Sequence, residues 1–138
     1  MTKSRKSVKP IEKTFIFDRL INDSDFELVY KMGRVVISED NIIKAKYLFE
    51  SKERNNTAKI GLSVASKKGN AVWRNRIKRI LRESLRIEKE GLRNIIEPKN
   101  ADLLIVFSPH SINQTNSKKI FLKEIKPAVL DILKKIGK

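Results

Sequence analysis

The segment Ala71–Arg86, AVWRNRIKRILRESLR, carries six basic residues and one acid, Glu83, in sixteen positions. On a period of 3.6 residues, its apolar side contains Trp73, Ile77, Ile80, Leu81 and Ser84. The opposite side holds a row spaced four, three and four residues apart, flanked by Arg76 and Lys78: Asn75, Arg79, Arg82 and Arg86. The spacing predicts an amphipathic helix with one face in a core and one cationic face. Burial must offset a repulsion of a few tenths of a kcal/mol per like-charged pair.

The composition predicts one basic domain. The chain has 138 residues, 40% of them hydrophobic, and 31 Lys and Arg against 16 Asp and Glu, a net charge of +15. This length allows a single core, and this charge favours a polyanionic partner. The absence of cysteine excludes disulfides, thiolate metal ligands and a cysteine nucleophile. No apolar run has the length of a signal peptide or membrane span, so we expect a cytoplasmic protein without a membrane partner.

The pattern along the chain predicts an α+β fold in the order α-β-β-β-α-β-α. A basic flexible arm is expected at 1–14 and a single domain at 15–138. The capping-box pattern at Ser24–Glu27 starts the first helix. The elements that follow from apolar periodicity are a helix at 25–32, strands at 34–38, 42–50 and 59–65, a helix from 71 to about 89, a strand at 102–108 and a helical segment at 121–136. Pro127 is expected to kink or divide the last segment.

The cationic row has three possible readings. A solvated helix face usually mixes charges of both signs, whereas this row has no balancing acid. A membrane-surface helix would need the apolar side that a domain of this size requires for its core. Arginine suits bidentate phosphate contacts and stacking on bases, so nucleic-acid binding is favoured. Asn75 either caps a helix start or presents its amide to a base edge or sugar hydroxyl.

The stretch Gly69–Glu83, GNAVWRNRIKRILRE, resembles the signature of the bacterial ribonuclease P protein subunit. It follows the strand residues Gly61–Val64, as in that family. Upstream, the similarity continues at Arg19-Leu20, Asp25-Phe26, Val29, Tyr30 and Gly33, and it spans about residues 19–108. Two positions depart from the family pattern: Ser66 stands at the first lysine position, and Trp73 replaces a smaller apolar residue.

This resemblance implies a four-stranded sheet with a left-handed crossover through the Arg-Asn-Arg helix. It also implies a protein subunit that binds the catalytic RNA of ribonuclease P and the 5′ leader of precursor tRNA. The subunit would assist endonucleolytic removal of the leader. Hydrolysis, with Mg²⁺, would belong to the RNA. No cofactor bound by the protein alone and no DNA partner are expected.

The resemblance also implies two sets of contact residues. The residues expected to face the catalytic RNA are Arg74, Arg76, Lys78, Arg82, Arg86 and Lys68. A cleft between the first helix and the sheet would hold the leader through Phe26, Tyr30, Tyr47, Ser63, Lys67, Asn75 and Arg79. Aromatic faces with cations suit unpaired nucleotides of any sequence. Without the resemblance, Phe26 and Tyr30 are read as helix–sheet core.

The residues themselves predict no catalytic or metal site in the protein. His110 is the single histidine, so it has no second histidine for paired acid–base cleavage of RNA. Asp23, Asp25 and Glu27 are typical of a helix start. Two alternatives stay open: a structural RNA-binding protein, such as a ribosomal component or RNA chaperone, and an autonomous nuclease.

Overall fold

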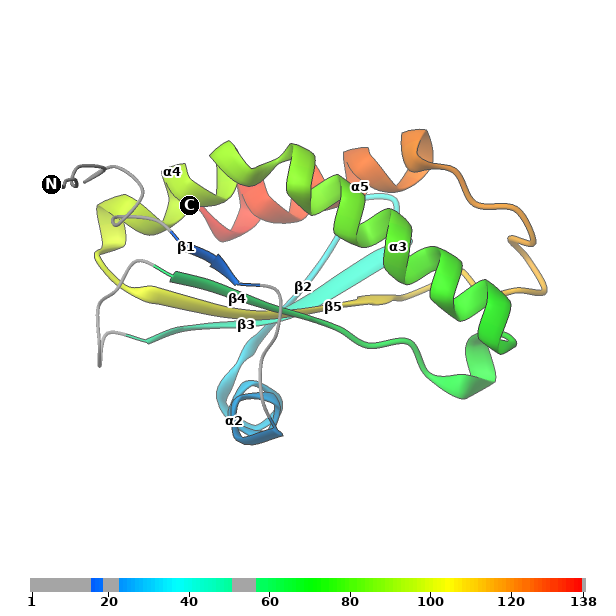
Figure 1. Ribbon diagram of the computed structural model, residues 1–138, viewed down its shortest axis with the longest axis horizontal. Helices are drawn as coiled ribbons and strands as arrows, with labels where there is room; N and C mark the ends of the chain where they lie inside the picture. The colour runs from blue at the N-terminus through cyan, green and yellow to red at the C-terminus, as the bar shows by residue number, and fades with distance from the viewer. Residues whose placement is uncertain (1–15, 19–22, 51–56, 138) are drawn as a thin grey trace, which may run out of the picture.

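The protein is a twisted mixed sheet with helices on both faces (Figure 1). The computed structural model describes residues 16–18, 23–50 and 57–137. The strands are β1 (Ile16–Asp18), β2 (Arg34–Ile37), β3 (Ile43–Glu50), β4 (Thr57–Leu62) and β5 (Asp102–Pro109). The helices are α2 (Asp23–Met32), the 3₁₀ turn η1 (Ser66–Lys68), α3 (Ala71–Ile87), α4 (Lys89–Lys99) and α5 (Leu122–Ile136).

The sheet has the strand order β1-β4-β5-β3-β2, with β5 at its centre. β5 pairs parallel with β4 and antiparallel with β3. Every β5 residue except Ser108 is buried, which explains why its sequence is continuously apolar rather than alternating. β4 and β5 are neighbours joined through α3 and α4, so the predicted crossover is present (Figure 1). Its left-handed sense stays a prediction from the family resemblance.

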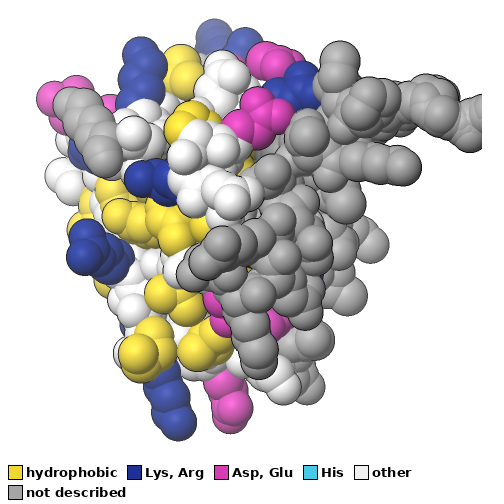
Figure 2. Space-filling view, turned by 90° about the vertical axis from the view of Figure 1, so that its left-hand side faces the viewer, with side chains coloured by type: hydrophobic (Ala, Val, Ile, Leu, Met, Phe, Trp, Pro, Cys, Tyr) yellow, Lys and Arg dark blue, Asp and Glu magenta, His cyan; other side chains and the backbone are white. Residues whose placement is uncertain are grey.

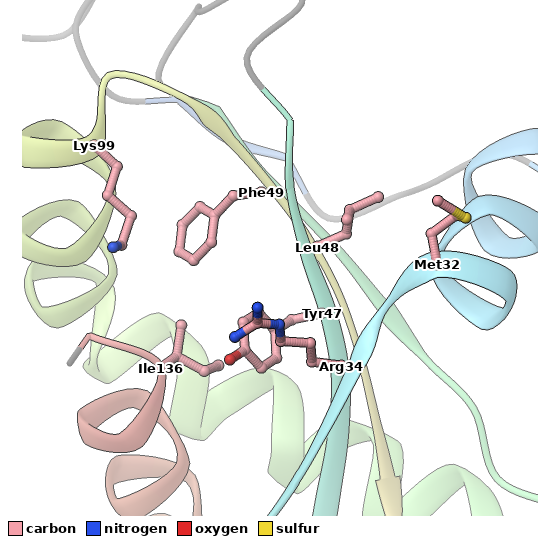
Figure 3. A pocket seen from close by; sticks show the side chains of 7 residues that line it. All are labelled: Met32, Arg34, Tyr47, Leu48, Phe49, Lys99 and Ile136. Atoms are coloured by element: carbon pink, nitrogen blue, oxygen red, sulfur yellow. The ribbon is translucent and has the colours of Figure 1, made fainter.

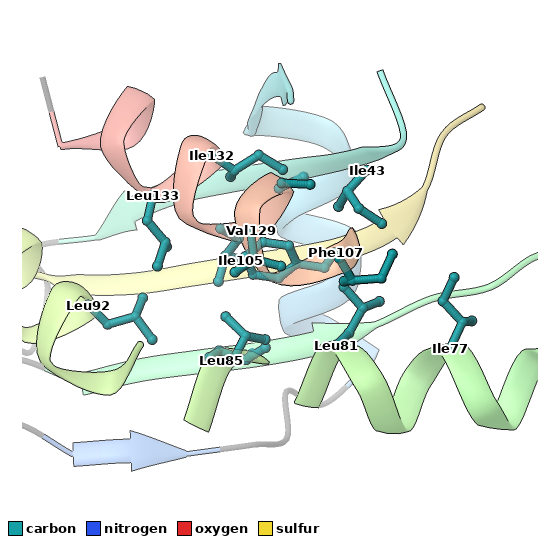
Figure 4. Packing of buried hydrophobic residues seen from close by; sticks show 14 of the residues in the cluster. Ile43, Ile77, Leu81, Leu85, Leu92, Ile105, Phe107, Val129, Ile132 and Leu133 are labelled. Carbon is teal, nitrogen blue, oxygen red and sulfur yellow. The ribbon is translucent and has the colours of Figure 1, made fainter. Parts of the chain in front are cut away.

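Two separate hydrophobic cores lie on the two faces of the sheet. On one face, α3, α4 and α5 pack over the strands and bury the larger core, which includes Ile77, Leu81, Ile105 and Phe107 (Figure 4). On the other face, α2 buries Val29 against Leu104 and Val106, with Phe26 and Leu28 packed beside them. The alternation of side chains along β5 therefore supplies both cores from one strand.

The predicted α+β single domain is confirmed, and all four predicted strands are present. The sheet also has a fifth strand, β1, which pairs parallel with β4. The basic helix ends at Ile87, but a further helix, α4, follows and contains Gly91. α5 runs through Pro127 as a single helix, so a division into two helices was wrong. The predicted arm at 1–14 lies outside the described residues.

Gly33 joins α2 to β2 because the backbone is too crowded there for a side chain. Its N–H donates a hydrogen bond of 2.8 Å to the Val29 carbonyl. A Cβ at this position would lie 2.4 Å from the Val29 carbonyl oxygen and 3.0 Å from that of Tyr47. Close approach of two backbone segments, rather than a left-handed conformation, therefore requires glycine here.

The larger core predicts a strong dependence of stability on Leu81, which is 0% exposed in α3. Leu81→Ala should lower the free energy of unfolding by about 2–5 kcal/mol, because it removes buried methyl groups and leaves a cavity. Urea unfolding followed by circular dichroism measures this loss. Val72→Ala on the same helix, where the side chain is 78% exposed, should change stability by less than about 0.5 kcal/mol.

Candidate nucleic-acid interface

The first part of the interface is the outward side of α3. Asn70 caps the helix by accepting a hydrogen bond of 2.9 Å from the Trp73 N–H. The stripe of Trp73, Ile77, Leu81 and Leu85 is buried in the larger core. The other side of the helix therefore faces solvent, where a shallow depression is lined by Val72, Asn75, Arg76, Lys78, Arg79 and Arg82. We call this surface, with Arg86, the arginine face. The predicted amphipathic helix is confirmed.

The basic side chains of α3 differ in the hydrogen bonds and ion pairs that they form within the protein. Arg74 Nε donates to the Gly69 carbonyl at 3.0 Å. Arg76 donates through Nε and Nη2 to the Ile120 carbonyl, both at 3.2 Å. Arg86 pairs with Glu83, and its hydrogen bond holds the pKa of that carboxyl below the ordinary value. Arg82 Nε is buried and has no hydrogen-bond acceptor among the described residues. An anion bound at this face could therefore accept a hydrogen bond from Arg82 Nε.

The connection 111–121 supports the start of α3. Trp73 Nε1 donates to the Ser117 carbonyl at 2.8 Å, and the Asn70 N–H donates to Gln114 Oε1 at 2.8 Å. Trp73, which departs from the family pattern, is thus buried and anchors this connection. Arg76 adds its bonds to Ile120, so part of its role is structural. The sequence gives no periodic signal for these contacts, because they join carbonyls of an irregular segment to a distant helix.

The second part of the interface lies on the α2 side of the sheet. The rings of Phe26 and Tyr30, one turn apart on α2, stack with centroids 6.1 Å apart. Phe26 packs against the smaller core, whereas Tyr30 is 48% exposed. Lys46 of β3 lies with its Nζ 5.5 Å from the Tyr30 ring centroid and donates to the Tyr30 carbonyl at 2.7 Å. An exposed aromatic face beside a cation suits a stacked, unpaired base.

Cations continue from Tyr30 toward the start of α3. Lys44 lies on the same side of β3 as Lys46, two residues earlier. Lys68 in η1 donates from Nζ to the His110 carbonyl. Burial, together with the positive charges of Lys44 and Lys67, lowers the pKa of Lys68. We call Lys46, Lys44, Lys68 and Lys67 the lysine row. It links the aromatic pair on α2 to the segment that enters α3.

Several predicted cleft residues come together on the α2 side, and others do not. Phe26 and Tyr30 lie there, and Lys67 belongs to the lysine row. Ser63 follows β4 in the same alternation as Lys59, whose ammonium lies 3.8 Å from the Asp25 carboxylate of α2. Its backbone N–H donates to the Phe107 carbonyl at 3.0 Å. The predicted cleft residues on this side therefore come from α2, from the end of β4 and from η1.

Tyr47 is not on the α2 side, so its placement in a shared cleft with Phe26 and Tyr30 was wrong. It pairs with Ile105 and packs against the larger core. Its neighbour Lys46 pairs with Val106 of the smaller core and takes the position beside Tyr30. A shift of one residue in the register of a strand moves a side chain to the opposite face of the sheet.

Asn75 and Arg79 join the arginine face instead of the aromatic pair, since both line the depression on α3. Asn70, not Asn75, caps the helix, which leaves the exposed Asn75 amide available. Sequence reasoning missed Lys44 and Lys46. The alternation along β3 places them together, but it does not say which face α2 covers.

The described residues contain no group of three or more His, Cys, Asp or Glu arranged to hold a metal ion. His110 donates its backbone N–H to the Ile42 carbonyl at 2.8 Å. None of the helices that the structure describes is long and apolar enough to cross a bilayer. The chemistry that the described site offers is binding of anions and aromatic rings.

Comparison with known proteins identifies relatives over most of the chain. The family model described as Ribonuclease P matches residues 17–133. The ribonuclease P protein component of Clostridium novyi is 30% identical over 120 residues, 87% of this chain and 94% of that protein. The solved RNase P protein of Thermotoga maritima has a TM-score of 0.67 at 24% identity, covering 86% of this chain and 96% of its own. That of Staphylococcus aureus has a TM-score of 0.58 at 25% identity, covering 84% and 92%.

The lysine row predicts a measurable coupling between Lys44 and Lys68. Lys44→Ala should raise the pKa of Lys68 toward the ordinary lysine value, because it removes one of the like charges that lower it. Burial, the larger cause, should keep part of the shift. NMR titration of isotopically labelled lysine measures the change. Lys89→Ala on α4 is the control and should leave Lys68 unchanged. An unchanged pKa in Lys44→Ala would mean that the two ammonium groups are not neighbours.

Proposed function

Because this chain belongs to the ribonuclease P protein family, we propose that it acts as the protein subunit of a ribonuclease P ribonucleoprotein. In this role it binds the catalytic RNA and the 5′ leader of precursor tRNA. Endonucleolytic removal of the leader then gives the mature 5′ end of the tRNA. Hydrolysis is assigned to the RNA with its Mg²⁺, and the protein side chains bind and position. The cytoplasm is the location that goes with this proposal.

The observation that carries the proposal is the arginine face. Its cations stand in one row on a helix whose other side is buried, so the positions from which they extend cannot move apart. The single acid of the segment, Glu83, is already paired with Arg86. A phosphate backbone converts this repulsion into attraction and satisfies the buried Nε of Arg82. Arg74, Arg76, Lys78, Arg82, Arg86 and Lys68 are the residues proposed to contact the catalytic RNA.

The leader is proposed to lie along the α2 side of the sheet. Tyr30 offers a ring face to an unpaired base, and Lys46, Lys44 and Lys67 of the lysine row offer successive cations to the phosphates that follow it. Stacking with backbone contacts tolerates any base sequence, as leaders of different tRNAs require. Ser63 and Phe26 border this path, whereas Asn75 and Arg79 lie at its far end on α3.

The proposal is tested first by reconstitution with a bacterial ribonuclease P RNA. Cleavage of a precursor tRNA at low magnesium should be stimulated by the wild-type protein at the mature 5′ end. Arg82→Ala should weaken binding of the RNA, and the log–log salt dependence should fall by about 0.7–0.9 for one lost phosphate contact. Lys89→Ala, an equal charge change on α4, serves as the control.

Two results of the reconstitution would contradict the proposal. Binding of the RNA without any stimulation of cleavage would favour a general structural RNA-binding protein, such as a ribosomal component or chaperone. Cleavage of precursor tRNA by the protein without RNA would favour an autonomous nuclease. An unchanged salt dependence in Arg82→Ala would remove this residue from the RNA contact.

The leader contact is tested at Tyr30. Tyr30→Ala should weaken the affinity of the holoenzyme for leader-bearing precursor by about 1–3 kcal/mol through lost stacking, with little change for mature tRNA. Equilibrium binding with both RNAs measures the difference. Tyr30→Phe keeps the ring and should restore the discrimination. Equal losses for the two RNAs would show that the ring contributes only to packing against Phe26.

A further inference from the structure

A second pocket lies at the edge of β3, where the side that carries α4 and α5 meets the end of α2 (Figure 3). Its volume of about 360 Å³ falls within the range of about 300–1,000 Å³ of small-molecule sites. Two aromatic and two basic side chains define it: Tyr47, Phe49, Arg34 and Lys99. Ile136 of α5 closes one side, and Met32 and Leu48 border the other. None of the arguments for the arginine face or the lysine row involves these residues.

The pocket exists because β2 is shorter than its partner. Pairing of β2 with β3 stops at Arg34 and Tyr47, whereas β3 continues to pair with β5 as far as Glu50. Among the described strands, nothing covers the outer edge of β3 at 48–50. Phe49 therefore packs at the margin of the larger core, where its ring points toward Lys99 at the end of α4 (Figure 3).

The rings of Tyr47 and Phe49 are arranged so that a planar group can bind between them. The centroids of Tyr47 and Phe49 are 6.0 Å apart and the rings are nearly perpendicular, at 80°. Both side chains are only half-buried. Lys99 Nζ stands 5.0 Å from the Phe49 centroid. A base can stack on one ring and meet the other at its edge, while the ammonium lies within reach of its phosphate.

The charge of the pocket favours an anion. Its lining contains two cations and no acid. Neither Arg34 nor Lys99 forms an ion pair with any residue in the described ranges. The face that holds this region shows hydrophobic side chains between separate Lys and Arg side chains (Figure 2). A flat apolar group that carries negative charge matches this combination.

We propose that this pocket binds an unpaired nucleotide of RNA, with the base against Tyr47 and Phe49 and a phosphate between Arg34 and Lys99. This inference rests on the proposed function for the identity of the polymer, but not for the pocket itself. Met32 follows Tyr30 by two residues on α2 and borders the pocket. The pocket thus begins at the end of the helix that carries Tyr30, although side chains two residues apart on a helix point in different directions.

The test uses the full-length protein without catalytic RNA and a uridine decamer carrying one photoreactive 4-thiouridine. The double variant Arg34→Ala and Lys99→Ala should weaken binding about tenfold, as expected for the loss of the two cations that hold the phosphate. Cross-linking to Tyr47 or Phe49 in the wild-type protein should fall by a similar factor. The matched control is Lys89→Ala and Lys134→Ala, which removes the same charge at exposed positions outside the pocket. It should weaken binding no more than about twofold.

Equal losses in the two double variants, or cross-links that avoid Tyr47 and Phe49, would overturn the proposal. Displacement of the decamer from the pocket by poly-aspartate as readily as by RNA would overturn it too, because the site would then select only charge. In the reconstituted holoenzyme, a defect that grows with leader length assigns the nucleotide to the leader. A defect independent of leader length assigns it to the catalytic RNA. If wild-type protein fails to stimulate cleavage but binds the decamer here, the proposed function fails and the pocket stands.

Discussion

The burial of one side of α3 determines where the positive charge of this protein can be used. Trp73, Ile77 and Leu81 pack into the core beneath α5, and the arginines on the opposite side have no freedom to turn inward. An isolated helix with this row of like charges would be unfavourable in water. Its stability therefore depends on tertiary packing, and so does the spacing of the cations.

Alternate residues of β3 place the remaining binding groups on opposite faces of the sheet. Even-numbered residues such as Lys44 and Lys46 face α2, whereas Tyr47 and Phe49 face the side of α4 and α5. One strand thus presents cations to one surface and rings to the other. Because β2 stops early, no strand that the structure describes covers the edge of β3 at 48–50, and the two surfaces meet there.

The sequence predicted most of the fold because its strongest signals are periodic. The amphipathic α3 and the apolar β5 were both located from their patterns. β1 was missed since a strand of three residues gives almost no alternation. α4 was missed because glycine at position 91 lowers the helix propensity of this segment, whereas burial of Leu92 and Ile96 favours a helix there.

The candidate site was less predictable than the fold. Residues on α3 share one helix, so their common surface follows from spacing alone. Tyr47 required the register of β3 relative to α2, which depends on pairing between distant segments. The bonds of Arg76 to Ile120 join residues 44 positions apart, and no local pattern encodes them. Sequence patterns located single elements well, and contacts between elements had to come from the structure.

The central position of β5 also determines the order in which the sheet can form while the chain is being synthesised. β4 and β3 are made before it and have earlier partners in β1 and β2, yet the two pairs join into one sheet only when residues 102–109 are available. During synthesis, the two halves of the sheet and the helix between them must wait for this strand. The arginine face leaves the ribosome, which is itself rich in RNA, before the core that orients this face has formed. The cations of the arginine face thus reach their final spacing late in the emergence of the chain, after β5 has joined the sheet.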